Sequence, residues 1–140
     1  MRMNSVLAAG ALAMGAVLAV PASAQAAAQQ FAFYTTDAKR GGYVSGTLVS
    51  GGSSWSTCSY AKIKNNSGSY VRDMARDGKA AVAWLVYTDC KSGAVKWREL
   101  GRASGYGKKD YLAGTPVYNA KKAKVAVCLS AKNNCRYSRY

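Results

Sequence analysis

Hydrophobic and polar residues alternate with a period of two along much of this chain of 140 residues. Such alternation places successive side chains on opposite faces of an extended strand. In Lys79–Asp89 ("KAAVAWLVYTD") the positions on both faces are apolar. A strand of this kind is typically covered on both sides, so Lys79–Asp89 is predicted to be a central strand.

Several shorter stretches show the same period. They predict strands at Tyr43–Ser50, Trp55–Asn65, Val95–Ser104 and Lys121–Ser130. Ser69–Gly78 fits either a strand or one helical turn, and Gly105–Asp110 is expected to be a loop. Turn residues separate these stretches every eight to twelve residues, and no helical period persists after residue 26. The pattern predicts an all-β protein, a small antiparallel β-sandwich or barrel.

The first 26 residues have a different pattern. Arg2 precedes the apolar stretch Ser5–Val20, and the small residues of "PASAQA" follow, with cleavage expected after Ala24 or Ala26. This order is typical of a secretory signal peptide. The apolar core of 16 residues is shorter than the roughly 20 residues that a membrane-spanning helix needs. We therefore expect a secreted, extracellular protein with no transmembrane segment in its mature form.

Residues 27–42 are expected to form an extended N-terminal arm, and residues 43–140 a single β domain. Phe31 and Phe33 lie two positions apart, so in an extended chain their side chains face the same way. Two alternatives remain open. The arm could bind a partner by strand addition, with both rings in pockets of that partner. It could instead fold back as the first strand of the domain itself.

The four cysteines lie in the predicted mature part of the chain. An even number of cysteines in an exported chain indicates two disulfides, with three possible pairings. A tight turn with Ala131 and Lys132 at its centre would place Cys128 opposite Cys135, which favours Cys128–Cys135 and, by subtraction, Cys58–Cys90. Crossed pairings remain possible.

The predicted mature chain is strongly basic, with 19 Lys and Arg against six Asp and Glu, a net charge of +13. Outside a cell, this charge favours acidic partners such as an acidic protein, a cell-wall polymer or an anionic surface. Basic and aromatic residues interleave in "VKWRELGR" and "CRYSRY", as nucleic-acid stacking surfaces require. Export nevertheless argues against a dedicated nucleic-acid role.

The residue types needed for most catalytic sites are scarce. The chain has no histidine, which excludes Ser-His-Asp, Cys-His and His-metal sites, and Glu99 is its only glutamate. Asp73 and Asp77 are expected to cap turns rather than form a carboxylate pair. No phosphate-binding motif is present, so we expect a protein without enzymatic activity, cofactor or metal.

Three segments carry a resemblance to a known class of proteins: "DGKAAVAWLVYTDC", "KWRELGRASGYG" and the closing "VAVCLSAKNNCRYSRY". With the signal peptide, they resemble the small secreted disulfide-bonded β proteins of actinobacteria. One group of these is the adaptor subunit of secreted umbrella-shaped antibacterial toxin particles. The resemblance implies a non-enzymatic link between a lectin-like subunit and a toxin subunit.

The expected function is therefore an extracellular protein-binding or adaptor module, and the alternative is a stand-alone cationic antibacterial or cell-wall-binding protein. Aromatic and arginine residues dominate interface hot spots. The residues expected to contact a partner are Phe31, Phe33, Tyr34, Arg136, Tyr137, Arg139 and Tyr140.

Overall fold

The computed structural model describes residues 26–139, so residues 1–25 of the predicted signal peptide and Tyr140 lie outside the described residues. The described chain contains nine strands and no helix, which confirms the all-β prediction. The strands are β1 (Ala27–Tyr34), β2 (Gly42–Ser50), β3 (Ser59–Ile63), β4 (Tyr70–Asp73), β5 (Ala81–Asp89), β6 (Val95–Ala103), β7 (Lys109–Tyr111), β8 (Val117–Leu129) and β9 (Asn133–Tyr137).

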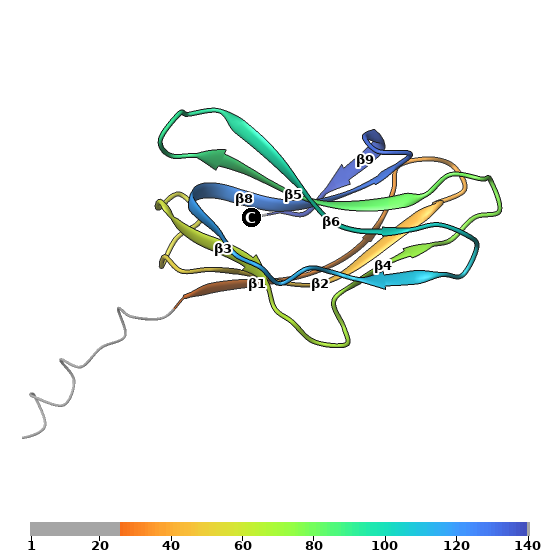
Figure 1. Cartoon of the computed structure of the whole chain (residues 1–140), viewed down its shortest axis with the longest axis horizontal. Helices are drawn as coiled ribbons and strands as arrows, with labels where there is room; N and C mark the ends of the chain where they lie inside the picture. Colours follow the sequence, from red (N-terminus) through yellow and green to blue (C-terminus); the bar gives the residue numbers. More distant parts are fainter. Residues whose placement is uncertain (1–25, 140) are drawn as a thin grey trace, which may run out of the picture.

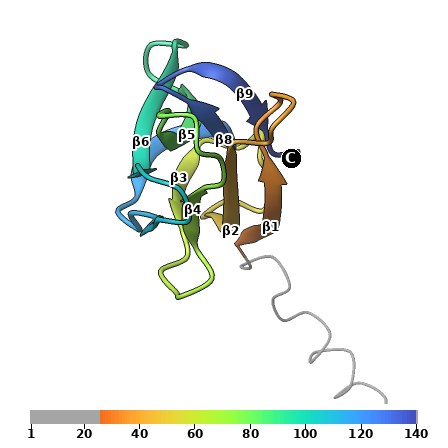
Figure 2. The ribbon, with the colours of Figure 1, turned by 90° about the vertical axis from the view of Figure 1, so that its right-hand side faces the viewer.

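All pairings are antiparallel, and the strands form one curled sheet in the order β6-β5-β8-β3-β2-β4-β7. β1 pairs with the edge of β2 that faces away from β3 and β4. β9 pairs with the last part of β8, whereas β3 pairs with its first part. The sheet folds over itself into a half-open barrel, with β5, β8 and β9 in one layer and β1 to β4 in the other (Figure 1). β1, β9 and the C-terminal end lie on one side of the molecule, opposite β6 (Figure 2).

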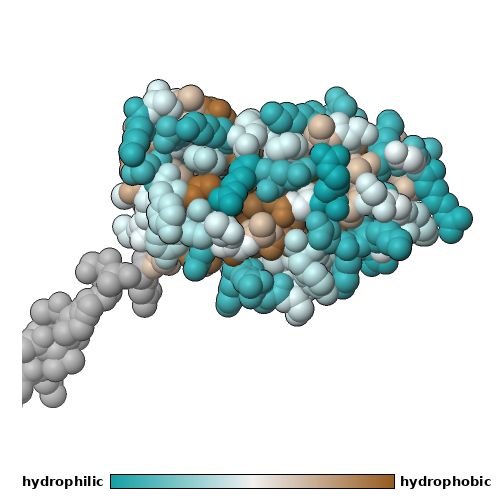
Figure 3. All heavy atoms as spheres, viewed as in Figure 1, coloured by the Kyte–Doolittle hydropathy of each residue, from teal (hydrophilic) through white to brown (hydrophobic). Residues whose placement is uncertain are grey.

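The core fills the space between the two layers. Val44, Leu48, Ile63, Leu85 and Val125 are almost completely buried there. A second, smaller cluster covers the outer face of β5 and β8 and contains Val86, Ala126 and Cys128 beneath the two indole rings of Trp84 and Trp97. β5 is therefore a central strand covered on both faces, as its sequence predicts. On the face in Figure 3, hydrophilic residues surround a smaller apolar area at the middle of the molecule.

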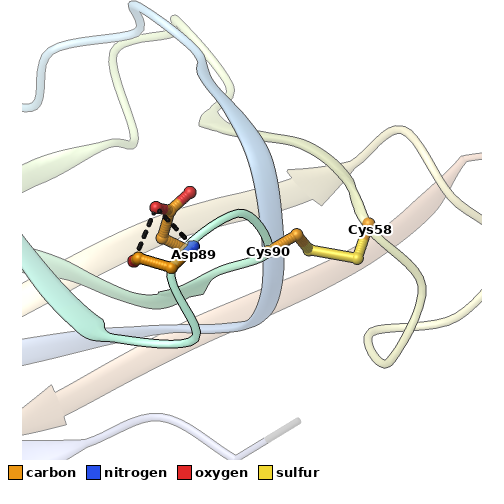
Figure 4. Close-up of a disulfide and its surroundings, with 4 residues drawn as sticks. Cys58, Asp89 and Cys90 are labelled. Atoms are coloured by element: carbon orange, nitrogen blue, oxygen red, sulfur yellow. Dashed lines mark hydrogen bonds between the residues drawn. A yellow bond between two sulfur atoms is a disulfide. The ribbon is translucent and has the colours of Figure 1, made fainter.

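Both favoured disulfides are present. Cys58–Cys90 connects the segment before β3 to the end of β5, and its Cα atoms are 6.2 Å apart (Figure 4). Beside it, Asp89 accepts hydrogen bonds from the hydroxyl and the backbone N–H of Ser92, which fixes the turn after β5. Cys128–Cys135 staples β8 to β9.

The turn between β8 and β9 differs from its prediction. Leu129 lies opposite Asn133 rather than Asn134, so the loop contains the three residues 130–132. Asn134 is the extra residue of a bulge and has a φ of 53°, a conformation that asparagine tolerates better than most residues. The bulge restores the register, and Cys128 and Cys135 still face each other.

Two strand assignments were incomplete. β7, expected to be loop, is a strand of three exposed residues that pairs with β4. It has no buried face, so no hydrophobic alternation marks it in the sequence. β8 begins at Val117, earlier than predicted. Its first part includes polar residues and the positive-φ positions Asn119 and Lys122, so the alternation that marks a strand is hard to recognise there.

The segment Ala27–Tyr34 forms β1 and pairs with β2 along its whole length. The structure thus shows the second alternative for this segment, the first strand of the domain. Phe31 is 7% exposed and belongs to the core cluster, and Phe33 packs against the same cluster. Gly46, the partner of Phe31, leaves room for its ring, because a Cβ at that position would lie 2.8 Å from Phe31 Cζ.

Candidate functional site

The candidate site begins at the turn that follows β1. Asp37 accepts the backbone N–H of Gly41 at 3.0 Å and 3.1 Å from its two oxygens, and the Thr35 hydroxyl also donates to it. Burial favours a higher pKa for Asp37, but these hydrogen bonds outweigh it and lower the pKa below its ordinary value. The ionised carboxylate thereby holds the turn that presents Arg40, whose guanidinium lies 5.5 Å from the ring centroid of Tyr34.

Two sheet edges meet just beyond this turn. The backbone N–H of Thr36 donates to the carbonyl of Asn134 at 3.1 Å, which joins the end of β1 to the start of β9. The chain after β9 stays on β8, because Ser138 N–H donates to Val125 O and Val125 N–H donates to the Ser138 hydroxyl. β1 pairs only with β2, so β1 and the C-terminal segment, residues 136–139, border a gap instead of pairing.

The edge of β1 that faces this gap exposes backbone hydrogen-bonding groups. Thr35 N–H donates to Gly42 O, and the Cα register continues unchanged from Tyr34↔Tyr43 to lower residue numbers. Because hydrogen-bonded and non-hydrogen-bonded pairs alternate in an antiparallel ladder, Phe31 and Phe33 bond to β2. The backbone groups of Gln30, Ala32 and Tyr34 therefore point to the open edge, where no other strand of residues 26–139 pairs with them.

The gap is a groove with a cavity volume of about 480 Å³. Its lining comes from both edges and the turn: Gln29, Gln30, Phe31, Ala32, Phe33, Tyr34, Arg40, Arg136, Tyr137, Ser138 and Arg139. Three of these are arginines and none is acidic, so the groove is electropositive. The side-chain carbonyl Oε1 of Gln29 is buried and lacks a hydrogen-bond partner among the described residues.

The structure brings six of the seven predicted contact residues to this one groove, and the seventh, Tyr140, lies outside the described residues. Phe31 contributes little side-chain surface because it belongs to the core, and Phe33 is half-buried. Tyr137 is 42% exposed and stacks edge-on against Trp97, with the ring centroids 5.9 Å apart. Arg136 and Arg139 are exposed at the rim.

Sequence reasoning missed Arg40 and Gln29. Arg40 lies in the turn "DAKRGG" and has a φ of 49°, which the sequence does not signal for an arginine. Gln29 precedes Phe31 by two positions, so the alternation that placed the phenylalanines inward also places Gln29 inward. The period of two in this segment therefore indicates the inward position of Gln29.

The acidic residues serve structural roles. Asp73 accepts the backbone N–H groups of Ala75 and Gly105, and Asp77 accepts that of Lys79, which confirms the expectation that both cap turns. The pKa of Asp89 is lowered chiefly by the Ser92 hydroxyl, and Lys96 forms an ion pair with Asp89 at 3.3 Å. Residues 26–139 contain no group of three or more Cys, Asp or Glu placed to hold a metal ion.

No helix in this part of the chain is long and apolar enough to span a membrane. No protein-family model, curated protein or solved structure matches the chain.

Proposed function

We propose that this protein is a secreted, non-enzymatic binding module that takes an extended acidic segment of a partner protein into the groove beside β1. The observation that carries the proposal is the open edge of β1, which borders a groove lined by three arginines. An extended peptide can satisfy such an edge by adding a strand to the sheet. The two disulfides suit an extracellular location.

Each part of the groove supports one feature of the ligand. The backbone groups of Gln30, Ala32 and Tyr34 can form ladder hydrogen bonds with any extended chain. The arginines at positions 40, 136 and 139 favour carboxylate side chains, which guanidinium groups can bind through two hydrogen bonds. The free Gln29 carbonyl can accept an N–H from the incoming backbone or side chain. The ligand is thus an extended segment that carries Asp or Glu.

In this proposal β1 stays in the domain and its edge receives an extended segment of the partner. In the earlier alternative, β1 left the domain and entered the partner. β1 is tied to β2 over eight residue pairs, and leaving the domain would expose Phe31 to water. Receiving a strand at the open edge leaves the pairing of β1 with β2 and the burial of Phe31 unchanged. The resemblance to adaptor subunits supports a place for the module within a secreted antibacterial complex.

The test is affinity isolation of the disulfide-bonded protein from the culture fluid of the producing cells, with charge reversal in the groove. We expect a stoichiometric partner with the unaltered protein, and at least a tenfold loss of its recovery with Arg136→Glu/Arg139→Glu. The matched control Arg76→Glu/Lys79→Glu makes the same charge change in the β4–β5 loop, away from the groove, and should keep the partner. Recovery of only a free monomer, or equal loss in both variants, would overturn the proposal.

A further inference from the structure

A second surface of the protein carries tyrosines and cations on the outer face of four neighbouring strands. Cross-strand partners share a face, and the registers place two rows side by side: Tyr34–Tyr43–Arg72–Lys109 and Ala32–Ser45–Tyr70–Tyr111. We call Tyr34, Tyr43, Tyr70, Tyr111, Arg72 and Lys109 the tyrosine face. Tyr111, Arg72 and Lys109 are exposed, and the other three rings are half-buried.

The tyrosine rings of this face contact Lys109 and the neighbouring Arg40. The rings of Tyr34 and Tyr43 are 4.9 Å apart and those of Tyr43 and Tyr70 are 6.0 Å apart, so they form a continuous row. The ammonium of Lys109 lies 5.0 Å from the ring centroid of Tyr70 and 5.4 Å from that of Tyr111. Arg40 covers Tyr34 at the other end. Cation–π contacts of this kind restrict flexible basic side chains and present their charges in fixed positions.

Arg72 and Lys109 are direct cross-strand partners. Like charges in directly opposed positions destabilise a sheet, and within residues 26–139 no carboxylate forms an ion pair with Arg72 or Lys109. The acidic residues of these four strands, Asp73 and Asp110, accept backbone N–H groups of Ala75, Gly105 and Arg102. A bound anion between Arg72 and Lys109 would turn this repulsion into attraction.

We propose that the tyrosine face binds a linear phosphodiester polymer of the polyol-phosphate class through its charged groups. Arginine can contact two phosphate oxygens at once, and lysine supplies a point charge beside it. The tyrosine hydroxyls can also donate hydrogen bonds to phosphate oxygens. Arg40 and Lys109 lie at opposite ends of a row that crosses from β1 to β7, roughly 14 Å at ~4.8 Å per strand. Two separated cationic positions fit a polymer with repeated phosphates better than a ligand with one anionic group.

The ring contacts argue against recognition of nucleic-acid bases. Stacking a base requires an open ring face, whereas Lys109 covers Tyr70 and Tyr111, and Arg40 covers Tyr34. The neighbouring rings are also tilted by about 50° to each other and do not form a flat platform. The geometry therefore favours a polymer that is recognised by its phosphates alone.

The test measures binding of poly(glycerol phosphate) to the disulfide-bonded protein by titration calorimetry, with Arg72→Gln/Lys109→Gln as the variant. We expect the variant to lose about tenfold or more in affinity, because two charge-assisted contacts disappear. The control Lys79→Gln/Lys91→Gln removes the same charge from the β4–β5 and β5–β6 loops and should lose less than threefold.

Three results would overturn the proposal. One is the absence of binding to poly(glycerol phosphate) at low salt. Another is an equal loss of affinity in the two double variants, which would indicate binding by net charge alone. The third is tighter binding of an oligothymidylate with the same number of phosphates, which would indicate that bases are stacked. If the double variant does not fold, Arg72→Gln alone is measured against Lys79→Gln. The substituted residues Arg72 and Lys109 do not line the groove beside β1, so this comparison is separate from the test of strand addition.

Discussion

Thr36 and Asn134 are joined by one backbone hydrogen bond of 3.1 Å, and at this point the end of β1 meets the start of β9. Beside this bond, the Asp37 turn presents Arg40. β1 and the C-terminal segment border a groove instead of pairing, and Arg40 belongs to its lining. The seam between β1 and the C-terminal segment is therefore open, and it places backbone groups, arginines and a free amide carbonyl together.

Phe31 should contribute to the stability of the domain. We expect Phe31→Ala to lower the free energy of unfolding by about 3–5 kcal/mol, because it removes a buried ring and leaves a cavity. Tyr106→Ala removes an aromatic side chain that is 57% exposed and serves as the control, with a much smaller change. Urea denaturation gives both values. A Phe31→Ala protein as stable as the unaltered one would mean that β1 is not part of the core.

Gly46 should be intolerant of any side chain. An added Cβ would lie 2.8 Å from Phe31 Cζ and 3.0 Å from the Ser69 hydroxyl oxygen. Gly46→Ala should therefore cost about 1–3 kcal/mol through displacement of Phe31. Combined with Phe31→Ala, the same substitution should cost less, because its main obstacle is gone. A double-mutant cycle measures this difference, and strict additivity would contradict the contact.

The two disulfides should contribute unequally. In the chain-entropy model, the sequence separation of 32 residues for Cys58–Cys90 corresponds to about 3.7 kcal/mol, and the separation of 7 for Cys128–Cys135 to about 2.5 kcal/mol. We expect the thermal midpoint to fall further for Cys58→Ala/Cys90→Ala than for Cys128→Ala/Cys135→Ala. The opposite order would show that the apolar cluster around Cys128 outweighs loop closure.

The Asp37 turn should give stability that depends on pH. Because the folded-state pKa of Asp37 lies below its ordinary value of 3.8, its carboxylate stabilises the fold above that pH. This contribution is lost as pH falls through the lowered pKa. Asp37→Asn should therefore be less stable than the unaltered protein at neutral pH, and the difference should shrink below pH 3.8. Thermal melts between pH 2 and pH 7 measure it, and a constant difference would exclude this role.

The fold was predictable where alternation was strong. β5, with apolar residues on both faces, was identified as central, and the spacing of Cys128 and Cys135 led to the correct bridge even though the turn itself was different. β7 was not predictable, because its three exposed residues pair through backbone groups that no side-chain pattern reveals. The bulge at Asn134 depends on a positive φ, which sequence alone does not fix.

Six of the predicted contact residues line one groove, but Arg40, Gln29 and the geometry of the groove were not predicted. Aromatic and arginine content pointed to both ends of the predicted mature chain. Their meeting across one groove depends on long-range pairing of β1 with β2 and of β9 with β8, which local patterns do not encode. The tyrosine face was missed for the same reason, since its four rings come from four separate strands.

Amide hydrogen exchange at the open edge of β1 tests the central claim most directly. In the free protein, the N–H groups of Gln30, Ala32 and Tyr34 should exchange rapidly, while those of Phe31 and Phe33, bonded to β2, should be protected. Binding of the acidic segment of the partner should slow exchange at the first three by at least tenfold and leave the other two unchanged. Edge amides that are already protected in the free protein, or that still exchange rapidly in the complex, would contradict the proposed strand addition at β1.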